Sequence, residues 1–530
     1  MKLKAPMSIK GISIAATFAV VISILALLSS CTRPVVDYLI TGATVFDGSL
    51  NEPRMLDVGI KGDRIVLITK PGKSRAEAAV TIDASGLYLA PGFIDPHTHA
   101  LSDLNSNNDR SLQAWLWQGV TTVFEGNDGS GPLPVGSQLD EWTERGIGIN
   151  AALFVGHGTV RGRVIGSKDT LAGPAEIEAM KELVKQAMEE GAFGLSSGLF
   201  YSPGSFANTA EVIELARVAA QYGGIYDTHM RDESSYGIGL IGSVKETIEI
   251  GEKAGLPVHI SHIKALGRDV WGKSEEVIKL VEEAQSRGLK VTANQYPYPA
   301  SKTGLKAAVV PRWAEDGGNS AMIKRFDDPS LKEKLDAEIA ENIWKRGGAN
   351  TIIFTAHGRD SLKGLSLGEA AARLGLDEVS AVKHILRGSA GIGIVSFNMQ
   401  EEDIRNFMQQ PWVMTGSDGG AGHPRKYGTF PRKIREYTLE KGYITLPEAI
   451  HRSSGLTAET MQVKERGMVK EGFYADLIVF NLNELRDMAT FDEPALHAKG
   501  MVWVFVNGVP AIEDGSYSGE LAGRALRLTD

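Results

Sequence analysis

The sequence predicts an α/β protein: a (β/α)8 barrel of the TIM type, with a small β-sandwich domain built from both ends of the chain. Three observations support this prediction. Eight short buried-strand candidates alternate with amphipathic helices through the middle of the 530-residue chain. Short strands separated by turn residues precede and follow this region. The sixty glycines suit the many tight turns that alternating strands and helices need.

The first thirty residues resemble a lipoprotein signal peptide. A basic start is followed by the apolar run "ISIAATFAVVISILALL" and by "LSSC", which ends at Cys31, the only cysteine. We therefore expect residues 1–30 to be removed and Cys31 to carry a lipid. The alternative is an uncleaved membrane anchor, because the run is almost long enough to span a bilayer. A single cysteine excludes an intramolecular disulfide.

The expected location follows from this signal. The protein would be exported and lipid-anchored in the bacterial cell envelope. No acidic residue directly follows Cys31, which favours the outer membrane, facing the periplasm. Residues 31–37 are expected to form a linker.

The small β-sandwich domain is expected from residues 38–91 and 468–530. "DYLITGATVFDG" and "LDVGIKGDRIVLI" lie near the start of the chain, and "ADLIVFNL" and "MVWVFVNGVPAI" lie near its end. Each is a short strand-like stretch bounded by turn residues. Their separation in sequence predicts one domain assembled from both ends.

Residues 92–467 are expected to form the barrel. The clearest helix is "PAEIEAMKELVKQAMEEG", which Pro174 opens and Gly191 ends, with apolar residues at helical spacing between them. An insertion around residues 300–368 contains the charged helix "DDPSLKEKLDAEIAENIWKRGG" and is predicted to form a lid or subdomain. The candidate barrel strands begin at Tyr88, Gly119, Ile147, Ala192, Gly224, Pro257, Leu289 and Pro411.

Composition limits the possible partners. Hydrophobic residues make up 43% and charged residues 23% of the chain, which is ordinary for a globular protein. The net charge is −9, whereas a nucleic-acid-binding protein usually has a basic face. We therefore expect no nucleic-acid partner.

Histidines and carboxylates follow several of the predicted barrel strands. The carboxyl ends of barrel strands meet at one rim, so residues far apart in sequence converge there. Imidazole nitrogens and carboxylate oxygens suit Zn²⁺ or a similar divalent metal, with one or two ions per subunit. These residues are His97 and His99 after strand one, Glu125 and Asp128 after strand two, His229 after strand five, His262 after strand six, and Asp418 after strand eight.

From about Asp37 to the C-terminus, the chain resembles the amidohydrolase superfamily and, within it, the D-aminoacylases (N-acyl-D-amino-acid deacylases). The resemblance rests on ten stretches in order: "APGFIDPHTH", "QGVTTVFEGNDG", "VGHGTVR", "GLFYSPG", "THMRDE", "ISHIKALG", "YPYPAS", "TGSDGG", "HPRKYGTFPR" and "GFYADLIVFN".

The resemblance implies a division of the metal ligands. His97, His99 and Asp418 would surround one metal position, while His229 and His262 would hold the other. In D-aminoacylases a cysteine of a "GNCG" motif completes the site, and "GNDG" places Asp128 there. Glu125, three residues earlier, remains an alternative ligand.

"GAFGLSSGLFYSPG", on predicted strand four, contains no lysine. Other branches of the superfamily use a carbamylated lysine there, so a hydantoinase-type or dihydroorotase-type site is not expected.

The resemblance also implies a small-molecule substrate and roles in the reaction. Asp418 would act as general base, taking a proton from a metal-activated water and giving it to the leaving nitrogen. The implied substrate-binding residues are Lys264, Tyr201, Tyr296 and Ser301. Tyr298 is an alternative to Tyr296, since either residue could point inward.

Neighbouring residues have less specific interpretations. Arg231 and Glu233 are expected to orient His229, or else to form a surface ion pair. His157 is expected in the pocket wall and His259 in a structural role. His423 and Arg425 lie on the loop after Asp418, which could contribute to side-chain specificity.

The predicted function is hydrolysis of a linear amide, most directly removal of the acyl group from N-acyl-D-amino acids. The first alternative is a dipeptidase acting on a D-residue or an isoaspartyl bond with the same machinery. The second is a catalytically inactive binding lipoprotein.

Overall fold

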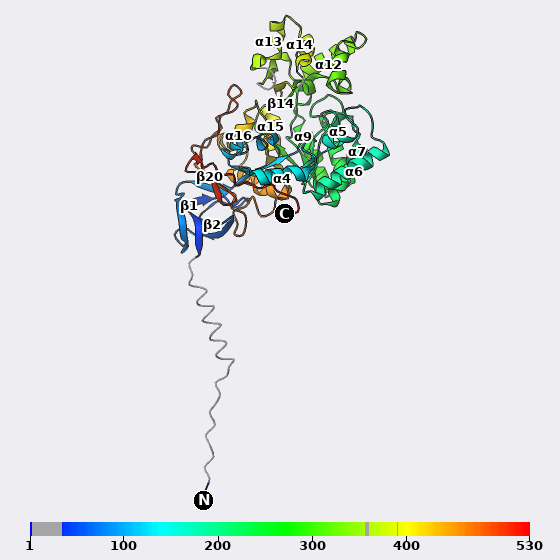
Figure 1. Cartoon of the computed structure of the whole chain (residues 1–530). Helices are drawn as coiled ribbons and strands as arrows, with labels where there is room; N and C mark the ends of the chain where they lie inside the picture. Colours follow the sequence, from blue (N-terminus) through cyan, green and yellow to red (C-terminus); the bar gives the residue numbers. More distant parts are fainter. Residues whose placement is uncertain (3–33, 356–359, 390) are drawn as a thin grey trace.

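The computed structural model describes the chain except for residues 3–33, 356–359 and 390. Figure 1 shows a barrel region, a β-domain that contains the first strands of the chain, and a third, largely helical unit on the opposite side of the barrel. The expected lipidation site, Cys31, lies outside the described residues.

Eight parallel strands form the barrel, so the (β/α)8 prediction is confirmed. They run in chain order, and each pairs in parallel with a neighbour. A parallel bridge between Thr98 and Gly419 joins the segments that follow the first and last strands. The strands are β6 (Phe93–Asp95), β7 (Val120–Glu125), β8 (Asn150–Leu153), β10 (Gly194–Gly198), β11 (Ile225–His229), β12 (Val258–Ile260), β13 (Val291–Gln295) and β17 (Val413–Thr415).

The first strand differs from the prediction. The segment expected to begin at Tyr88 divides into β5 (Tyr88–Pro91), which joins the outer sheet, and β6, which belongs to the barrel. Gly92 separates them, and a Cβ there would lie 2.2 Å from Thr121 Oγ1. The chain therefore passes between two sheets at a residue with no room for a side chain, a feature that an apolar run does not reveal.

Helices cover the outside of the barrel. Helix α6 (Pro174–Glu189) has the expected proline at its start, and its buried face contains Met180, Val184 and Met188. The apolar stripe packs inward because its residues recur at helical spacing. The other long barrel helices are α4 (Val135–Arg145), α7 (Thr209–Gln221), α8 (Gly239–Ala254) and α9 (Ser274–Ser286).

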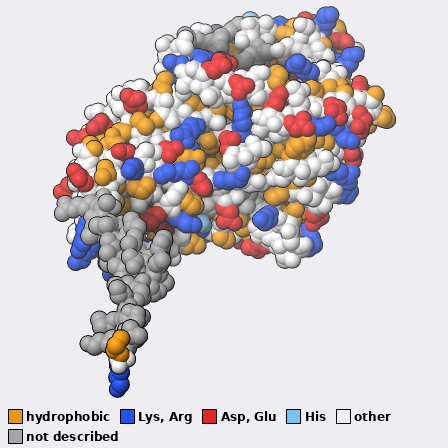
Figure 2. Space-filling model, turned by 60° about the horizontal axis from the view of Figure 1, so that its bottom comes forward, with side chains coloured by type: hydrophobic (Ala, Val, Ile, Leu, Met, Phe, Trp, Pro, Cys, Tyr) orange, Lys and Arg blue, Asp and Glu red, His pale blue; other side chains and the backbone are white. Residues whose placement is uncertain are grey.

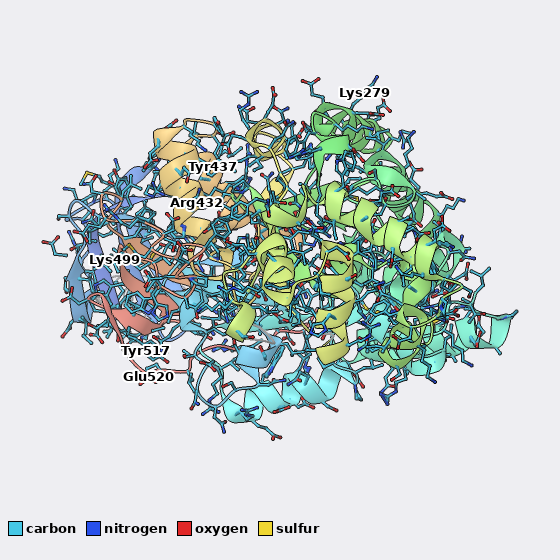
Figure 3. All side chains as sticks on the ribbon, turned by 90° about the horizontal axis from the view of Figure 1, so that it is seen from above. Lys279, Arg432, Tyr437, Lys499, Tyr517 and Glu520 are labelled. Atoms are coloured by element: carbon cyan, nitrogen blue, oxygen red, sulfur yellow. The ribbon has the colours of Figure 1, made fainter. Side chains whose placement is uncertain are left out.

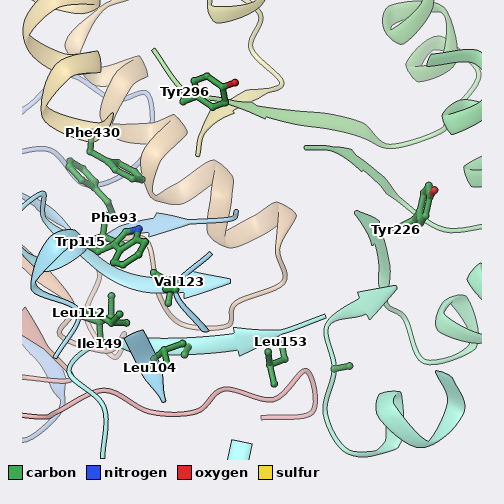
Figure 4. Close-up of a cluster of buried hydrophobic side chains, with 14 of the residues drawn as sticks. Phe93, Leu104, Leu112, Trp115, Val123, Ile149, Leu153, Tyr226, Tyr296 and Phe430 are labelled. Atoms are coloured by element: carbon green, nitrogen blue, oxygen red, sulfur yellow. The ribbon is translucent and has the colours of Figure 1, made fainter. Parts of the chain in front are cut away.

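Aromatic side chains fill the core between the first strand and the last helices. Phe93 stacks on Phe430 with ring centroids 5.4 Å apart. Trp115 is fully buried and donates from its indole nitrogen to Asp95 Oδ2 at 3.1 Å. Figure 4 shows Phe93, Trp115 and Phe430 together in this part of the core. The packing fixes the start of the loop that carries the first histidines.

Strands from both chain ends form one nine-stranded sheet. On one side, β1 (Val35–Val45) pairs with β2 (Arg54–Lys61), which pairs with β3 (Arg64–Thr69). On the other, β5 pairs with β18 (Leu477–Phe480), and β19 (Met501–Val506) and β20 (Val509–Glu513) follow. The Ile65 N–H donates to Phe473 O at 2.9 Å. The sheet thus curls over its own apolar core, as a small sandwich does.

An inserted unit lies between β13 and β17. Its antiparallel sheet contains β14 (Ala300–Gly304), β16 (Gly393–Phe397) and β15 (Ile352–Phe354). Helices α10 (Leu305–Val309), α11 (Asn319–Phe326), α12 (Lys332–Lys345), α13 (Leu367–Leu374) and α14 (Glu378–Gly388) complete it.

This unit extends further than the expected 300–368. Strand β16 returns to pair with β14 along its length, so the chain leaves the insertion only after Phe397. The unit also buries an apolar core of its own, including Leu305, Ile339 and Ile385. It is a subdomain rather than a single lid helix.

Acidic and basic side chains are interspersed over the face that Figure 2 presents. Among the residues that the structure describes, no helix combines the length and apolar character needed to cross a membrane.

Candidate metal centre

His97 and His99 lie on the loop that leaves β6. Asp95 fixes this loop: its Oδ1 accepts from the backbone N–H of Ser417 at 2.9 Å and of His97 at 3.3 Å. The backbone also joins the loops after the first and last strands, because Asp418 N donates to His97 O at 2.9 Å. Residues after the first and last strands are therefore held against each other.

Asp128 lies at the centre of the histidines. Its Oδ1 is 3.5 Å from His97 Nε2, 3.6 Å from His229 Nδ1 and 3.4 Å from His262 Nε2. Its Oδ2 is 3.5 Å from His99 Nε2. One carboxylate thus reaches both pairs of histidines, which is the arrangement of a bridging ligand.

Glu125 points elsewhere. Its Oε1 accepts from Thr98 Oγ1 and from the backbone N–H of Ala100, and its side chain is buried. It fastens the loop on which His97 and His99 lie. Of the two carboxylates considered after strand two, the structure therefore places Asp128 among the histidines and Glu125 beneath them.

His229 ends β11 and His262 follows β12, and Glu233 lies behind both. Glu233 Oε1 is 3.0 Å from His262 Nδ1, which leaves His262 Nε2 facing Asp128. The same oxygen accepts from Lys264 Nζ at 2.5 Å, and Oε2 lies 3.7 Å from His229 Nε2. A carboxylate behind a histidine fixes its tautomer and ring orientation.

Asp418 follows β17 and faces His97 and His99. Its Oδ1 is 3.0 Å from His99 Nε2 and 3.8 Å from His97 Nε2. Its Oδ2 forms an ion pair with Arg425 Nη2 at 2.7 Å. The carboxylate is therefore shared between the histidine cluster and a buried guanidinium.

Three of these residues have unusual backbones. Asp128, His262 and Asp418 have φ values of 56°, 36° and 47°. Positive φ disfavours residues with a Cβ and is concentrated at functional sites, where surrounding contacts stabilise it. Around Asp128 the packing is close, since a Cβ on Gly198 would lie 2.1 Å from Asp128 O.

The donor set fits divalent metal. His97 Nδ1 and Nε2 and Asp128 Oδ1 are buried and have no hydrogen-bond partner. Buried polar atoms without partners are costly, and His97 Nε2 and Asp128 Oδ1 face each other within the cluster. Within each of three groups, the ligand atoms all lie within 4.8 Å of one another. The groups are His97, Asp128 and His262; His97, His99 and Asp418; and His229, Glu233 and His262.

Overlapping groups allow one ion or two. Because Asp128 lies beside all four histidines, it can complete either position. Nitrogen and oxygen ligands of this kind suit Zn²⁺.

The electrostatics keep the carboxylates ionised. Burial alone would raise the pKa of Asp128, but the surrounding histidines hold it well below its usual range. Arg425 has the same effect on the pKa of Asp418 against its burial. Burial lowers the pKa of His97 well below its usual value, which leaves a neutral imidazole suited to bind metal.

The four predicted substrate-binding residues lie beside the metal cluster. Lys264, Tyr201, Tyr296 and Ser301 all line a small cavity of about 40 Å³ next to Asp128 and Asp418. Tyr298 does not line it; its ring packs against His423 with centroids 5.3 Å apart. Tyr296 is therefore the inward residue of the pair.

Other predicted residues have structural contacts. Arg231 pairs with Glu246 on α8, with Nη2 and Oε1 2.8 Å apart, and does not orient His229. That interpretation was wrong for Arg231, although Glu233 does lie beside the ring. His157 forms a hydrogen bond with Glu211 at 2.9 Å behind the pocket wall. His259 forms a hydrogen bond with Thr292 at 2.9 Å inside the barrel.

Two further cations lie at the site that were not predicted: Lys302 and Arg346, both from the inserted unit. Lys302 directly follows Ser301 on β14, and Arg346 follows α12. Their positions depend on how the insertion folds back over the barrel, which no motif in the sequence indicates.

A wider cleft of about 520 Å³ also borders His99 and Asp128. Backbone and small residues form much of its wall, and Lys302 and Arg425 also line it. Its small-residue lining is Gly129, Ser130, Gly158, Thr159, Gly198, Ser202, Gly204, Gly304, Gly391 and Gly393.

A (β/α)8 barrel with a histidine–carboxylate metal cluster at the carboxyl ends of its strands defines the class of metal-dependent barrel hydrolases. The model of the amidohydrolase family matches residues 80–512. The chain belongs to the amidohydrolase family.

Similarity to a named relative also supports membership of this family. The chain is 34% identical to a D-aminoacylase of Alcaligenes xylosoxydans xylosoxydans, over 93% of this chain and 98% of the relative.

Two solved structures are also similar. One, of a D-aminoacylase described as having a binuclear metal centre, has a TM-score of 0.80 at 32% identity and covers 93% of this chain and 100% of that chain. The other is N-acyl-D-glutamate deacylase from Bordetella bronchiseptica complexed with zinc and a phosphonate inhibitor. It has a TM-score of 0.79 at 30% identity and covers 93% of this chain and 99% of that chain.

Proposed function

We propose that the protein is a metal-dependent amide hydrolase that removes the acyl group from N-acyl-D-amino acids. The observation that carries the proposal is a set of buried donors without partners beside the metal ligands. Tyr296 Oη and Arg425 Nε and Nη1 are buried and make no hydrogen bond. These donors fit the free α-carboxylate of an N-acyl amino acid.

Lys264 lies near these donors. Arg425 lies 4.4 Å and Lys264 Nζ 5.8 Å from the centre of the Tyr296 ring. We refer to Lys264, Tyr296 and Arg425 as the carboxylate cradle. A substrate whose carboxylate binds there has its amide next to the ligands of the metal.

Six residues are the proposed metal ligands. His97, His99, Asp128, His229, His262 and Asp418 would hold the ion. A zinc ion bound there supplies Lewis acidity, which lowers the pKa of a water and polarises an amide carbonyl.

Asp418 acts as the general base because it lies at the cluster and Arg425 keeps it ionised. It takes a proton from the attacking water while the water oxygen bonds the acyl carbon. It then gives this proton to the nitrogen as the C–N bond breaks. Tyr201, whose ring centroid lies 4.7 Å from that of His229, borders the reacting carbonyl and can donate to its oxygen.

The dipeptidase alternative is less favoured by the cleft. A dipeptide would bring a free ammonium group into the wider cleft. Among the described residues that line this cleft, Asp128 is the only acidic one, and Lys302 and Arg425 are cationic. An uncharged acyl group avoids the repulsion that an ammonium group would meet. The preference for the D configuration rests on the likeness to D-aminoacylase.

The test is amine release by zinc-supplemented protein from matched N-acetyl-D-amino acids, N-acetyl-L-amino acids and D-residue dipeptides. We expect turnover of the N-acetyl-D set. Turnover of dipeptides alone would move the function to peptide hydrolysis, and binding without turnover in any set would favour the inactive binding protein.

We also propose that Cys31 carries a lipid that anchors the exported protein in the cell envelope, at the outer membrane facing the periplasm. The support is the sequence of residues 1–31. Incorporation of a labelled fatty acid in the wild type, and its loss in Cys31→Ser, is the expected result. Labelling that persists in the variant would exclude this anchor.

A further inference from the structure

The small cavity and the wider cleft beside the metal cluster together have more cations than carboxylates: four against Asp128, Glu233 and Asp418. Four cations border the site: Lys264, Lys302, Arg346 and Arg425. Two of them are neutralised, since Lys264 pairs with Glu233 and Arg425 pairs with Asp418. Asp128 belongs to the metal ligands. Any bound divalent cation increases this excess.

Arg346 is one of the two cations left over. It follows α12 of the inserted unit and is 2% exposed. Its Nε donates to Tyr236 Oη at 2.8 Å and its Nη1 to Ser301 Oγ at 3.4 Å. Within the described part of the chain, no carboxylate lies within 4.0 Å of its guanidinium. Two neutral hydroxyls orient it, but neither balances its charge.

Lys302 is the other cation without a counter-ion. It lies on β14 and borders both the small cavity and the wider cleft. A Cβ on Gly420 would lie 2.9 Å from Lys302 Nζ, so this glycine leaves room for the ammonium group beside the loop of Asp418. No described residue places a carboxylate within ion-pair distance of Lys302.

Buried or half-buried cations without counter-ions are unfavourable unless something else supplies negative charge. The α-carboxylate of an N-acyl amino acid supplies one charge, and the carboxylate cradle receives it. Lys302 and Arg346 remain. Their charge is matched by a substrate that carries a second carboxylate.

We propose that Lys302 and Arg346 form a second anion subsite, which selects N-acyl-D-amino acids with an acidic side chain such as D-glutamate or D-aspartate. This proposal rests on the proposed deacylase function and names its substrate class.

A second carboxylate could also come from the acyl group. We place it on the side chain because Lys302 and Arg346 border the small cavity together with Lys264 and Tyr296 of the cradle. An acyl group would occupy the wider cleft, which Arg346 does not line.

The test compares kcat/KM of the zinc-loaded protein for N-acetyl-D-glutamate and for its neutral isostere N-acetyl-D-glutamine. We expect a preference of about tenfold or more for the glutamate compound, because hydrogen bonds to charged groups are strong. Lys302→Met and Arg346→Met should each reduce this ratio about tenfold. Equal rates for the two substrates in the wild type would contradict the proposal.

N-succinyl-D-glutamine separates the two sources of the second carboxylate. It should react no faster than N-acetyl-D-glutamine if the subsite receives the side chain. A preference for the succinyl compound would overturn the side-chain assignment.

Binding gives a readout independent of turnover. Calorimetric titration with the free products should show tighter binding of D-glutamate than of D-glutamine, with the difference reduced in both variants. If no substrate is hydrolysed and this difference is still found, the deacylase function fails and the anion subsite stands. If hydrolysis occurs but the glutamate and glutamine compounds show no difference in binding or rate, the anion subsite is refuted and the deacylase function stands.

Lys279→Met is the matched control. Lys279 lies on α9 with a 76% exposed side chain, at the edge of the molecule in Figure 3, and it should leave both ratios as in the wild type. Thermal unfolding of each variant shows whether it is folded. A change of ratio in the control equal to that in Lys302→Met would refute a specific role for Lys302.

Discussion

His229 Nδ1 and His262 Nε2 lie 2.9 Å apart, and both face Asp128 Oδ1. Two imidazole nitrogens approach this closely when they share a proton or when both bind one metal ion that lies beside them. His262 Nδ1 is already bonded to Glu233, so its Nε2 is the atom left for the cluster. This relationship links the metal ligands to the carboxylate behind them.

Replacement of the bridging carboxylate should weaken metal binding. In Asp128→Asn the side chain loses its charge, whereas asparagine tolerates the positive φ of this position. We expect zinc affinity to fall at least tenfold, measured by competition with a chromogenic chelator. Asp128→Cys should retain tight zinc binding because thiolate is a good zinc ligand. Equal affinity in wild type and Asp128→Asn would show that Asp128 is not a ligand.

Glu233→Gln should also reduce metal affinity, by about 10-fold to 100-fold, because it leaves His262 poorly oriented and Lys264 unpaired. Metal content after dialysis measures the effect. Glu246→Gln serves as the control, since Glu246 pairs with Arg231 away from the cluster. Equal losses in both variants would indicate a general loss of stability rather than an effect on His262.

Asp418→Asn should lower kcat by at least about 100-fold, since it removes the group that accepts the proton from water. The second metal position, with His229 and His262, does not include Asp418, so at least one zinc ion per chain should remain bound. Single-turnover kinetics together with metal analysis check both statements. Near-normal turnover with metal bound would assign the base to another residue.

The preference for an acidic side chain should fall as pH rises through about 8. Burial, reinforced by the positive charges of Arg425 and Lys426, lowers the pKa of Lys302 to about 8, while Asp418 opposes the shift. Below this pH Lys302 is charged and attracts a carboxylate; above it the charge is lost. KM for N-acetyl-D-glutamate should therefore rise above pH 8 relative to that for N-acetyl-D-glutamine.

The same pH series on Lys302→Met provides the control. The relative KM should no longer change around pH 8 in this variant. An unchanged pH dependence would assign the titration to another group.

Much of the fold was predictable because its signals are local. Helix α6 follows from Pro174 and the apolar spacing up to Met188, and the barrel follows from the repeated alternation of strand and helix. The limits of the inserted unit were not predictable from local signals. Its end depends on β16 pairing with β14 across nearly ninety intervening residues.

The metal centre was partly predictable for the same reason. His97, His99, His229, His262 and Asp418 each follow a buried strand, and barrel topology brings such positions to one rim. The choice between Asp128 and Glu125 depended on side-chain direction, which the sequence left open. Arg231 was misassigned because α8 offers it Glu246, a partner that the motif does not contain.

The sequence by itself determined the class of fold, the family and the chemical types of the metal ligands, because these depend on local periodicity and on residues next to strand ends. Only the tertiary structure decided that Asp128 bridges the histidines, that Tyr296 points inward, and that Lys302 and Arg346 reach the site without counter-ions. The physical reason is that direction, burial and charge balance arise from contacts between distant segments, above all between the barrel and the insertion.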